Sequence, residues 1–182
     1  MKIQAIAFNI YLLAAIILTG CKSPQEKMDA KQSREQKKEL STIRFHIEAT
    51  GDNSNRAGGV PILRESPISV NIVRQSFLDE RDILSASIVN HMGGFVIQVQ
   101  FDDHGTFVLD NMSTAHKGKR IAILSEFGDK RWLAAPVITR RMADGAITFT
   151  PDATREESER IVRGLNNTAS KLRDKSLIRN IW

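Results

Sequence analysis

The chain opens on an apolar segment that is too short to cross a membrane as a helix. A positively charged Met1-Lys2 precedes Ile3–Leu18, which is interrupted by only two polar residues and is apolar throughout from Ile10 onward. A spanning helix needs about 20 consecutive apolar residues. A shorter apolar run after a positive start is typical of a secretory signal peptide. We therefore predict that residues 1–20 direct export and are then removed.

The apolar segment ends at the only cysteine in the chain. The residues Leu18-Thr19-Gly20-Cys21 are similar to a bacterial lipobox, in which small residues before the cysteine fit the lipoprotein signal peptidase. This resemblance implies cleavage before Cys21 and attachment there of a diacylglyceryl group and an amide-linked acyl chain such as palmitate. More than one chain is what stable membrane anchoring requires. The alternative is a signal anchor with an incidental buried cysteine, and the polar run that begins at Lys22 argues against it.

The residues after the cysteine indicate a location and a spacer. In enterobacterial lipoproteins an Asp at the second position favours the inner membrane, and this chain has Lys22 there. We expect a lipid anchor on the cell membrane or the outer membrane, with the protein facing the periplasm or the exterior. Residues 21–40 contain six basic and four acidic side chains and almost nothing to bury. Such a segment cannot offset its ordering entropy, so we expect a flexible, transiently helical tether.

Residues 41–182 are long enough for one domain with its own hydrophobic core. Runs with strand-like alternation or β-branched content are Thr42–Glu48, Ile68–Val73, Phe95–Phe101, Arg120–Leu124, Trp132–Ile138 and Ala146–Phe149. A loop is predicted at Gly51–Gly59, and turns are predicted at Gly93-Gly94 and at Gly128-Asp129-Lys130. Adjacent strands near the end of the chain suit hairpins.

Three helices are predicted between these strands. One runs from a cap at Asp79 toward His91, and a second runs from Asp103 or Thr106 through Lys117, closed by Gly118. The last follows Asp152 or Thr154, and its inner face is formed by Ile161, Val162, Leu165, Ala169 and Leu172. The pattern predicts an α+β fold with a mixed or antiparallel sheet and helices packed on one side. The C-terminal tail is basic, and its apolar residues are expected to complete the core; these are Leu172, Leu177, Ile178, Ile181 and Trp182. A contact of the tail with a membrane interface or a partner is the alternative.

An ordered set of features lies within residues 68–165. These are Phe101-Asp102, Gly105, a helix carrying Thr114, Gly118-Lys119, Ile121-Ala122-Ile123, Pro136-Val137-Ile138, Gly145-Ala146-Ile147-Thr148 and Glu156-Glu157. In this order they resemble the head part of the large extracytoplasmic domain of the protein-export subunit SecD. The resemblance implies an α+β module that contacts emerging polypeptide or partner proteins. SecD also carries several membrane spans that couple proton flow to export, which residues 41–182 do not resemble.

One further departure concerns packing. The helix of the SecD head usually holds small residues where this chain has Ser158 and Asn166, so we expect different packing at these positions.

Candidate catalytic and metal-binding residues are few. Asp102, Asp103 and His104, with His116 twelve residues later, are the residues that most resemble a divalent-metal site. We favour a strand-to-helix turn there, because Asp and Gly are expected at such turns and the two histidines lack the spacing that places ligands on one helix face. No serine lies in a nucleophile elbow, and no glycine pair has the pattern of a phosphate loop. We therefore predict no catalytic residue, metal or cofactor.

The expected partners follow from charge and composition. The formal net charge of +5 is dispersed, and aromatic residues make up only 6% of the chain, which argues against a nucleic-acid groove. We predict contact with a membrane through lipid on Cys21 and with a protein or polypeptide partner through a sheet edge or helix groove. The predicted function is non-enzymatic protein binding with a link to protein export. The alternatives are a metal-dependent envelope hydrolase that uses Asp102, Asp103 and His104, and a structural envelope protein that assembles with itself.

Overall fold

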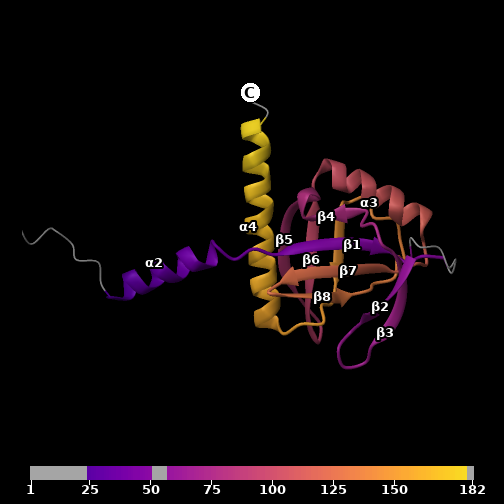
Figure 1. Cartoon of the computed structure of the whole chain (residues 1–182), viewed down its shortest axis with the longest axis horizontal. Coiled ribbons are helices and arrows are strands. Elements are labelled where there is room, and N and C mark those ends of the chain that lie inside the picture. Colours follow the sequence, from indigo (N-terminus) through magenta and orange to yellow (C-terminus); the bar gives the residue numbers. More distant parts are fainter. Residues whose placement is uncertain (1–23, 51–56, 180–182) are drawn as a thin grey trace, which may run out of the picture. The chain divides into compact units, whose positions relative to one another are not determined.

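Antiparallel sheets and two long helices form the unit Gln36–Trp182, whose elements are labelled in Figure 1. This computed structural model describes residues 24–50 and 57–179. The strands are β1 (Thr42–Ile47), β2 (Ala57–Ile62), β3 (Ile68–Val73), β4 (Leu78–Asp79), β5 (Ile83–His91), β6 (Gly94–Phe101), β7 (Ile121–Phe127), β8 (Asp129–Ala134) and β9 (Ala146–Phe149). The helices of this unit are the short 3-10 helix η1 (Glu80–Asp82), α3 (Asp103–Ala115) and α4 (Arg155–Arg179).

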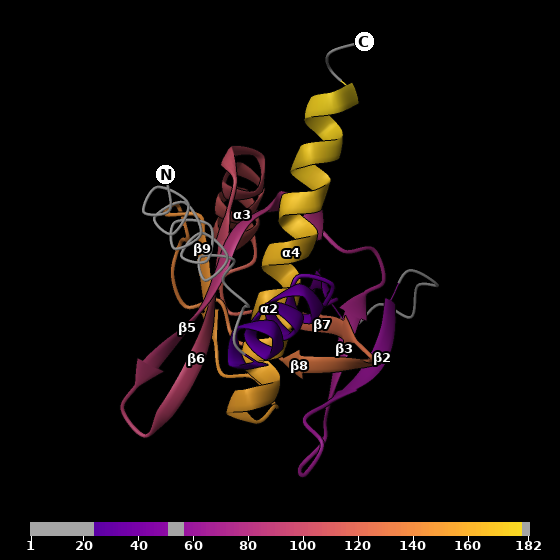
Figure 2. The same ribbon diagram turned by 90° about the vertical axis from the view of Figure 1, so that its left-hand side faces the viewer.

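The described strands form three sheets. A four-stranded sheet has the order β4–β1–β7–β8, a three-stranded sheet has the order β5–β6–β9, and β2 pairs with β3. Every pairing between these strands is antiparallel. The predicted α+β class is therefore confirmed. In Figure 2 the β5–β6–β9 sheet lies to one side of α4, and β7, β8, β2 and β3 lie to the other.

The hydrophobic core joins the two larger sheets to α4. Phe45 of β1 and Phe101 of β6 are fully buried and meet edge to face, with ring centroids 5.2 Å apart. Helix α4 contributes the buried side chains of Ile161, Val162, Leu165 and Ala169 from its predicted inner face, whereas Leu172, the fifth predicted member, is only half-buried. Close approach of α4 to the start of β1 depends on Gly164, because a Cβ there would lie 2.9 Å from both the backbone nitrogen and the Cβ of Ser41.

Helix α2 (Pro24–Gln36) lies within the segment predicted to be a tether, residues 21–40. Nearly all of it belongs to a separate unit, Met1–Glu35. The predicted signal peptide, its Leu18-Thr19-Gly20 motif, the lipidation site Cys21 and the C-terminal Trp182 lie outside the described residues. Among the helices of the described part, none is both long and apolar enough to span a membrane.

The segment after Asp79 is a strand where the sequence predicted a helix. Asp79 does cap a helix, but that helix is only η1, and β5 begins at Ile83. The helical prediction relied on Ile83, Ala86 and Val89, whose spacing would place them on one helical face. Pairing with β6 along the whole of β5 outweighs this local spacing. The β-branched side chains of the segment also suit a strand.

Other predicted boundaries are wrong as well. The predicted loop at Gly51–Gly59 includes the start of β2, which pairs with β3 from Ala57 onward; residues 51–56 lie outside the described part. Helix α3 is capped by Asp102, whose carboxylate accepts the Gly105 N–H at 2.8 Å, and not by Asp103 or Thr106. The strand predicted at Trp132–Ile138 is β8, which ends at Ala134. Pro136 follows two residues later and cannot donate a hydrogen bond to a strand pairing.

The β2–β3 hairpin packs near a buried histidine of β1. His46 is only 6% exposed, its Nδ1 lies 3.1 Å from the Val73 carbonyl oxygen, and its ring meets Trp132 edge to face at 5.4 Å. Its Nε2 is buried and has no hydrogen-bond partner among the described residues. Burial lowers the pKa of His46, and the positive charges of Arg44 and Lys130 lower this pKa further, against the opposing effect of the Val73 carbonyl.

The depressed pKa of His46 predicts acid sensitivity. The folded state keeps the ring neutral, whereas the unfolded chain takes up a proton near pH 6.5. Stability is therefore complete above about pH 6.5 and falls as the pH decreases toward the folded-state pKa, with a slope of up to about 1.4 kcal/mol per pH unit. Urea unfolding at a series of pH values measures this slope. His46→Leu should abolish it in this window, and an unchanged slope in that variant would assign the effect to other groups.

Candidate functional site

The two outer strands of the β5–β6–β9 sheet differ in what covers them. The amide of Asn166, on α4, binds the backbone of Ala86 in β5 as a neighbouring strand would. The Ala86 N–H donates to Asn166 Oδ1 at 2.8 Å, and Asn166 Nδ2 donates to the Ala86 carbonyl at 2.9 Å. One side chain thus satisfies both outward backbone groups of an edge residue.

Helix α4 follows β5 from one end to the other. Near the β5–β6 turn, Arg155 donates to the Asn90 side chain at 2.7 Å. At the opposite end, Arg173 donates to the carbonyls of Ile83 and Leu84 at 3.2 and 3.0 Å. Eighteen residues of α-helix and seven of strand have similar lengths of about 25 Å, which allows this match. The β5 edge is therefore occupied by α4.

Strand β9 forms the other edge of this sheet. Its register pairs Thr148 with Gln98 and Ile147 with Val99. The Phe101 N–H donates to the Gly145 carbonyl at 2.9 Å, so Gly145 and, by alternation, Ile147 and Phe149 direct their backbone groups toward β6. The N–H and carbonyl of Thr148 consequently point away from β6. In the described part of the chain, no backbone hydrogen bond is recorded on that side of Thr148.

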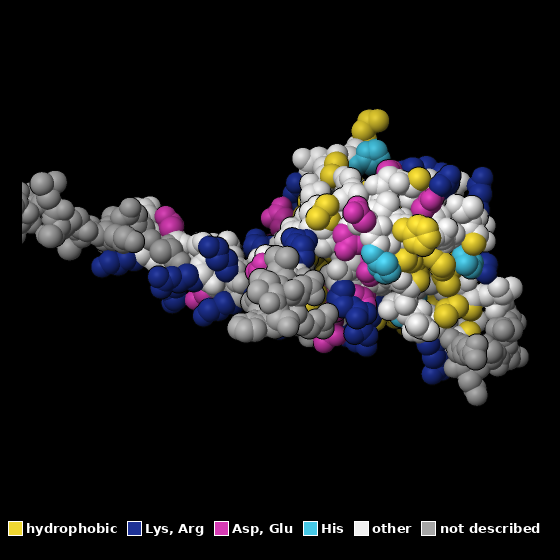
Figure 3. Space-filling view, turned by 90° about the horizontal axis from the view of Figure 1, so that it is seen from above, with side chains coloured by type: hydrophobic (Ala, Val, Ile, Leu, Met, Phe, Trp, Pro, Cys, Tyr) yellow, Lys and Arg dark blue, Asp and Glu magenta, His cyan; other side chains and the backbone are white. Residues whose placement is uncertain are grey.

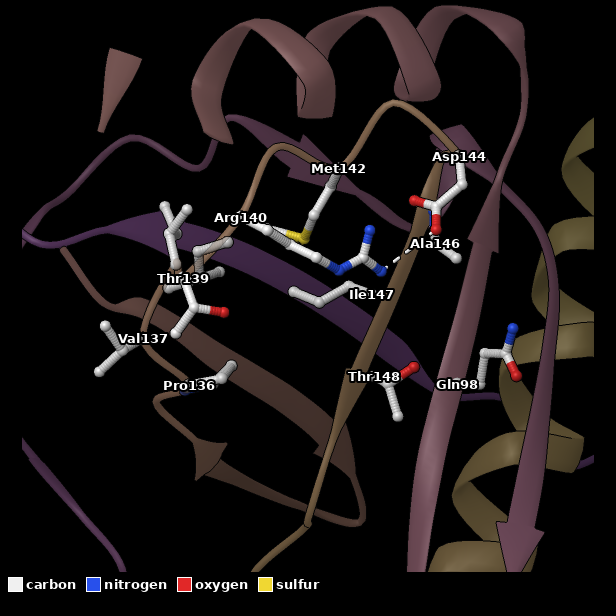
Figure 4. A pocket seen from close by; sticks show the side chains of 12 residues that line it. Gln98, Pro136, Val137, Thr139, Arg140, Met142, Asp144, Ala146, Ile147 and Thr148 are labelled. Carbon is white, nitrogen blue, oxygen red and sulfur yellow. Dashed lines mark hydrogen bonds and ion pairs between the residues drawn. The ribbon is translucent and has the colours of Figure 1, made fainter. Parts of the chain in front are cut away.

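A pocket of about 330 Å³ lies beside this edge (Figure 4). Strand β9 and Gln98 of β6 form one side, and the segment from Pro136 to Met142 forms the other. The complete lining is Gln98, Ile121, Pro136, Val137, Ile138, Thr139, Arg140, Met142, Asp144, Ala146, Ile147 and Thr148. Buried Ile121, Ile138 and Ile147 give it an apolar base, and the exposed polar side chains of Arg140 and Asp144 also line it.

The wall opposite β9 is fixed by hydrogen bonds to the rest of the domain. The Ile121 N–H donates to the Pro136 carbonyl at 2.9 Å, and the Ile138 N–H donates to the Lys119 carbonyl at 2.8 Å. The Met142 N–H donates to Ser113 Oγ at 2.9 Å, which ties the segment to α3. The pocket wall therefore belongs to the rigid part of the fold, and a ligand would meet a preformed shape.

Two arginines of this segment are already paired. Arg141 forms a bidentate ion pair with Asp110 of α3, at 2.5 and 2.6 Å, and the pair lowers the pKa of the Asp110 carboxyl group. Arg140 contacts Asp144 at 3.2 Å, and both residues line the pocket. Both partners of this second pair are more than half exposed, so the contact is easily exchanged for one to a ligand.

The residues weighed as a metal site are brought together only in part. Asp102 and His104 lie near Asp82, with their ligand atoms within 4.8 Å of one another, whereas Asp103 is not part of this group. His116 lies at the far end of α3, with its Nδ1 3.2 Å from the Met112 carbonyl oxygen. The sequence did not connect Asp82 with this turn.

The carboxylates near His104 have structural roles. Asp102 caps α3, and Asp82 Oδ2 accepts the Asp79 N–H at 3.0 Å to complete the capping box of η1. The remaining Asp82 oxygen lies 2.9 Å from His104 Nδ1. These contacts are those of a strand-to-helix turn, the interpretation that the sequence favoured.

The face that carries α3 offers a second apolar surface. Figure 3 shows hydrophobic side chains gathered beside histidines on this face. Phe107 of α3 is 68% exposed. Unlike the pocket beside β9, this surface presents a helix whose backbone groups are already paired, so it offers side-chain contacts alone.

Comparison with known proteins identifies the fold. No protein-family model and no curated protein sequence matches the chain. A solved structure of SecDF, described as a membrane component that enhances protein export, matches with a TM-score of 0.53 and 18% identity, over 82% of this chain and 71% of that one. SecDF in its super-membrane-facing form matches with a TM-score of 0.54 and 18% identity, over 77% of this chain but only 20% of that one. The described domain therefore has a SecD-like α+β fold, as the resemblance over residues 68–165 implied.

Proposed function

We propose that this protein is a membrane-anchored, extracytoplasmic module that binds extended polypeptide at the outer edge of β9, in a role connected with protein export. The observation that carries the proposal is the contrast between the two edges of one sheet. Edge β5 is occupied by α4 through Asn166, whereas the outward backbone groups of Thr148 in β9 lie beside a pocket. The same sheet thus has one covered edge and one available edge.

The proposed mechanism is strand addition. In this binding mode, main-chain hydrogen bonds supply affinity and pockets for alternate side chains supply selectivity. An added strand would pair with the N–H and carbonyl of Thr148. Its side chains on one face would enter the apolar base formed by Ile121, Ile138 and Ile147, and those on the other face would lie toward Gln98 and Thr148. A segment in which apolar and polar residues alternate fits this arrangement.

The likeness in fold supports the connection with export, because the matching part of SecDF belongs to a protein described as enhancing protein export. The activity of that whole protein is a further step, since the chain spans only 20% of one of the SecDF chains it matches. Lipid on Cys21 would hold the module at the membrane surface, where exported chains emerge. We propose binding rather than catalysis for this site.

Replacing Thr148 with proline tests the proposal. Proline removes the outward N–H, which takes no part in pairing with β6, so the fold should tolerate it. We expect at least about a tenfold loss of affinity for fluorescent peptides with alternating valine and threonine, equivalent to one lost hydrogen bond and local misfit. Thr148→Val keeps the N–H and the shape and should bind within about twofold of the original. Equal binding by the proline variant would rule out strand addition at β9.

A second measurement places the site in the cell. A photo-crosslinking residue at position 148 of the full-length protein should capture secreted chains during export. The same residue at position 111, on the exposed side of α3, serves as the control and should capture far less. Capture from position 111 but not from position 148 would move the binding surface to α3. Capture of only the protein itself from position 148 would favour self-assembly.

A further inference from the structure

The basic residues of α2 are arranged along one face of the helix. Lys27, Lys31 and Arg34 follow one another at intervals of four and three residues, which places them on one side of an α-helix. We call these three residues the basic stripe. All three are exposed, and Figure 3 shows Lys and Arg side chains gathered along this helix. At about 100° per residue, Asp29 lies on the opposite side, and Glu35, four residues after Lys31, lies at one edge of the stripe.

The charges of the stripe are not neutralised within the described part of the protein. None of the three side chains forms an ion pair with a described acidic residue, although nine pairs between an arginine and a carboxylate occur elsewhere in that part. The helix is also strongly polar, with Met28 its one large exposed hydrophobic side chain. It therefore lacks the apolar face that would insert into a bilayer. Any attraction to a membrane must be electrostatic.

We infer that the basic stripe docks α2 on anionic phospholipid headgroups. Ammonium and guanidinium groups form charge-assisted hydrogen bonds with phosphate oxygens. Each Lys or Arg close to an anionic leaflet raises partitioning by roughly fivefold at physiological ionic strength, so three on one face give about a hundredfold. Lys37 and Lys38 follow directly after the helix and add to the positive field. Segment 24–36 has no aromatic residue for stacking on bases, so a lipid surface fits it better than nucleic acid.

The inference concerns a surface separate from β9 and does not depend on the proposed polypeptide site. It changes what the predicted tether does, because a helix lying on headgroups restrains the domain near the membrane instead of only giving it reach. The stripe begins six residues after Cys21. If Cys21 carries lipid, the acyl chains and the stripe would act on the same membrane patch as two signals.

Vesicle binding by a chain that begins at Lys22 tests the inference. This shortened chain keeps helix α2 and the folded unit, because all residues that the structure describes lie between 24 and 179. The stripe is dispersed by two exchanges of neighbours, Lys31→Gln with Gln32→Lys and Arg34→Ser with Ser33→Arg. This variant has the same composition and net charge, but its basic side chains point in different directions.

We expect sedimentation with vesicles that contain 30 mol% phosphatidylglycerol and about a tenfold weaker partition for the dispersed variant. The difference in partition between the two proteins should shrink as the salt concentration is raised toward 0.5 M, where the Debye length falls to about 4 Å. Vesicles of phosphatidylcholine alone should bind neither protein. Equal partition of the two proteins would show that net charge alone causes the binding, which would overturn the inference. An absence of binding to anionic vesicles would overturn it as well. Circular dichroism of both proteins checks that the exchanges leave helicity unchanged.

Discussion

Replacing Gly145 with alanine should lower the free energy of unfolding by about 3 kcal/mol. Gly145 has φ +66°, which an alanine adopts only with strain. Its added Cβ would overlap Thr106 Oγ1 and lie 2.9 Å from Thr106 Cβ, so α3 and the start of β9 would have to separate. Urea unfolding followed by circular dichroism measures the change.

A matched glycine separates the two causes. Gly118 also has positive φ, at +86°, but a Cβ there would meet nothing within 4 Å. Gly118→Ala should therefore cost only the backbone term, about 1 kcal/mol. Equal losses for the two variants would show that contact with Thr106 is unimportant. Because the Gly145 carbonyl accepts from Phe101 N and from Gln100 Nε2, the first variant should also disturb the pocket beside β9.

Replacing Asn166 with alanine should cost about 2–3 kcal/mol and expose the β5 edge. The substitution leaves the N–H and carbonyl of Ala86 without partners at a residue that is only 7% exposed. Asn166→Asp is nearly isosteric and retains an acceptor for the N–H, but it repels the carbonyl, so it should be destabilising as well. The free energy of unfolding is measured as for Gly145. Size-exclusion chromatography should show concentration-dependent association, because a bare strand edge pairs with other edges.

The neighbouring residue provides the control. Asn167 donates to the carbonyls of Gln36 and Glu39, outside the sheets. Asn167→Ala removes hydrogen bonds from the same helix without exposing a strand, and we expect about 1 kcal/mol and no association. If both variants associated equally, exposure of β5 would not be the cause.

Local patterns in the sequence were sufficient for many elements of the fold. The strand at Ile68–Val73 and the strand at Ala146–Phe149 are confirmed at both ends. Four of the five residues predicted for the inner face of α4 are buried, because the period of 3.6 residues is a local property; Leu172 is only half-buried. The helix predicted after Asp79 failed because pairing of β5 with β6 depends on residues farther along the chain. Spacing alone cannot weigh such a contact against helical propensity.

Local patterns in the sequence could not predict the candidate site. Its parts come from β6, β9 and the segment after Pro136, which only the topology brings together. Asn166 did carry a signal, since a polar residue next to Leu165 on the inner side of a helix requires a buried partner. The sequence marked Asn166 only as a departure from the SecD head. That its partner is the edge of β5 could not be deduced, because β5 was taken for a helix.

The coverage of β5 by α4 limits how copies of this protein can associate through the β5–β6–β9 sheet. Two copies that met through β9 would form a pair with twofold symmetry, and the pair would have no further β9 edge for a third copy. Such association would stop at two and could not lengthen into a fibre. It would also compete with the proposed guest polypeptide for the same hydrogen-bonding groups. Saturation with polypeptide should therefore keep the protein monomeric. Because self-association increases with protein concentration, a higher concentration of the protein requires tighter binding of the polypeptide for the β9 edge to stay occupied by it.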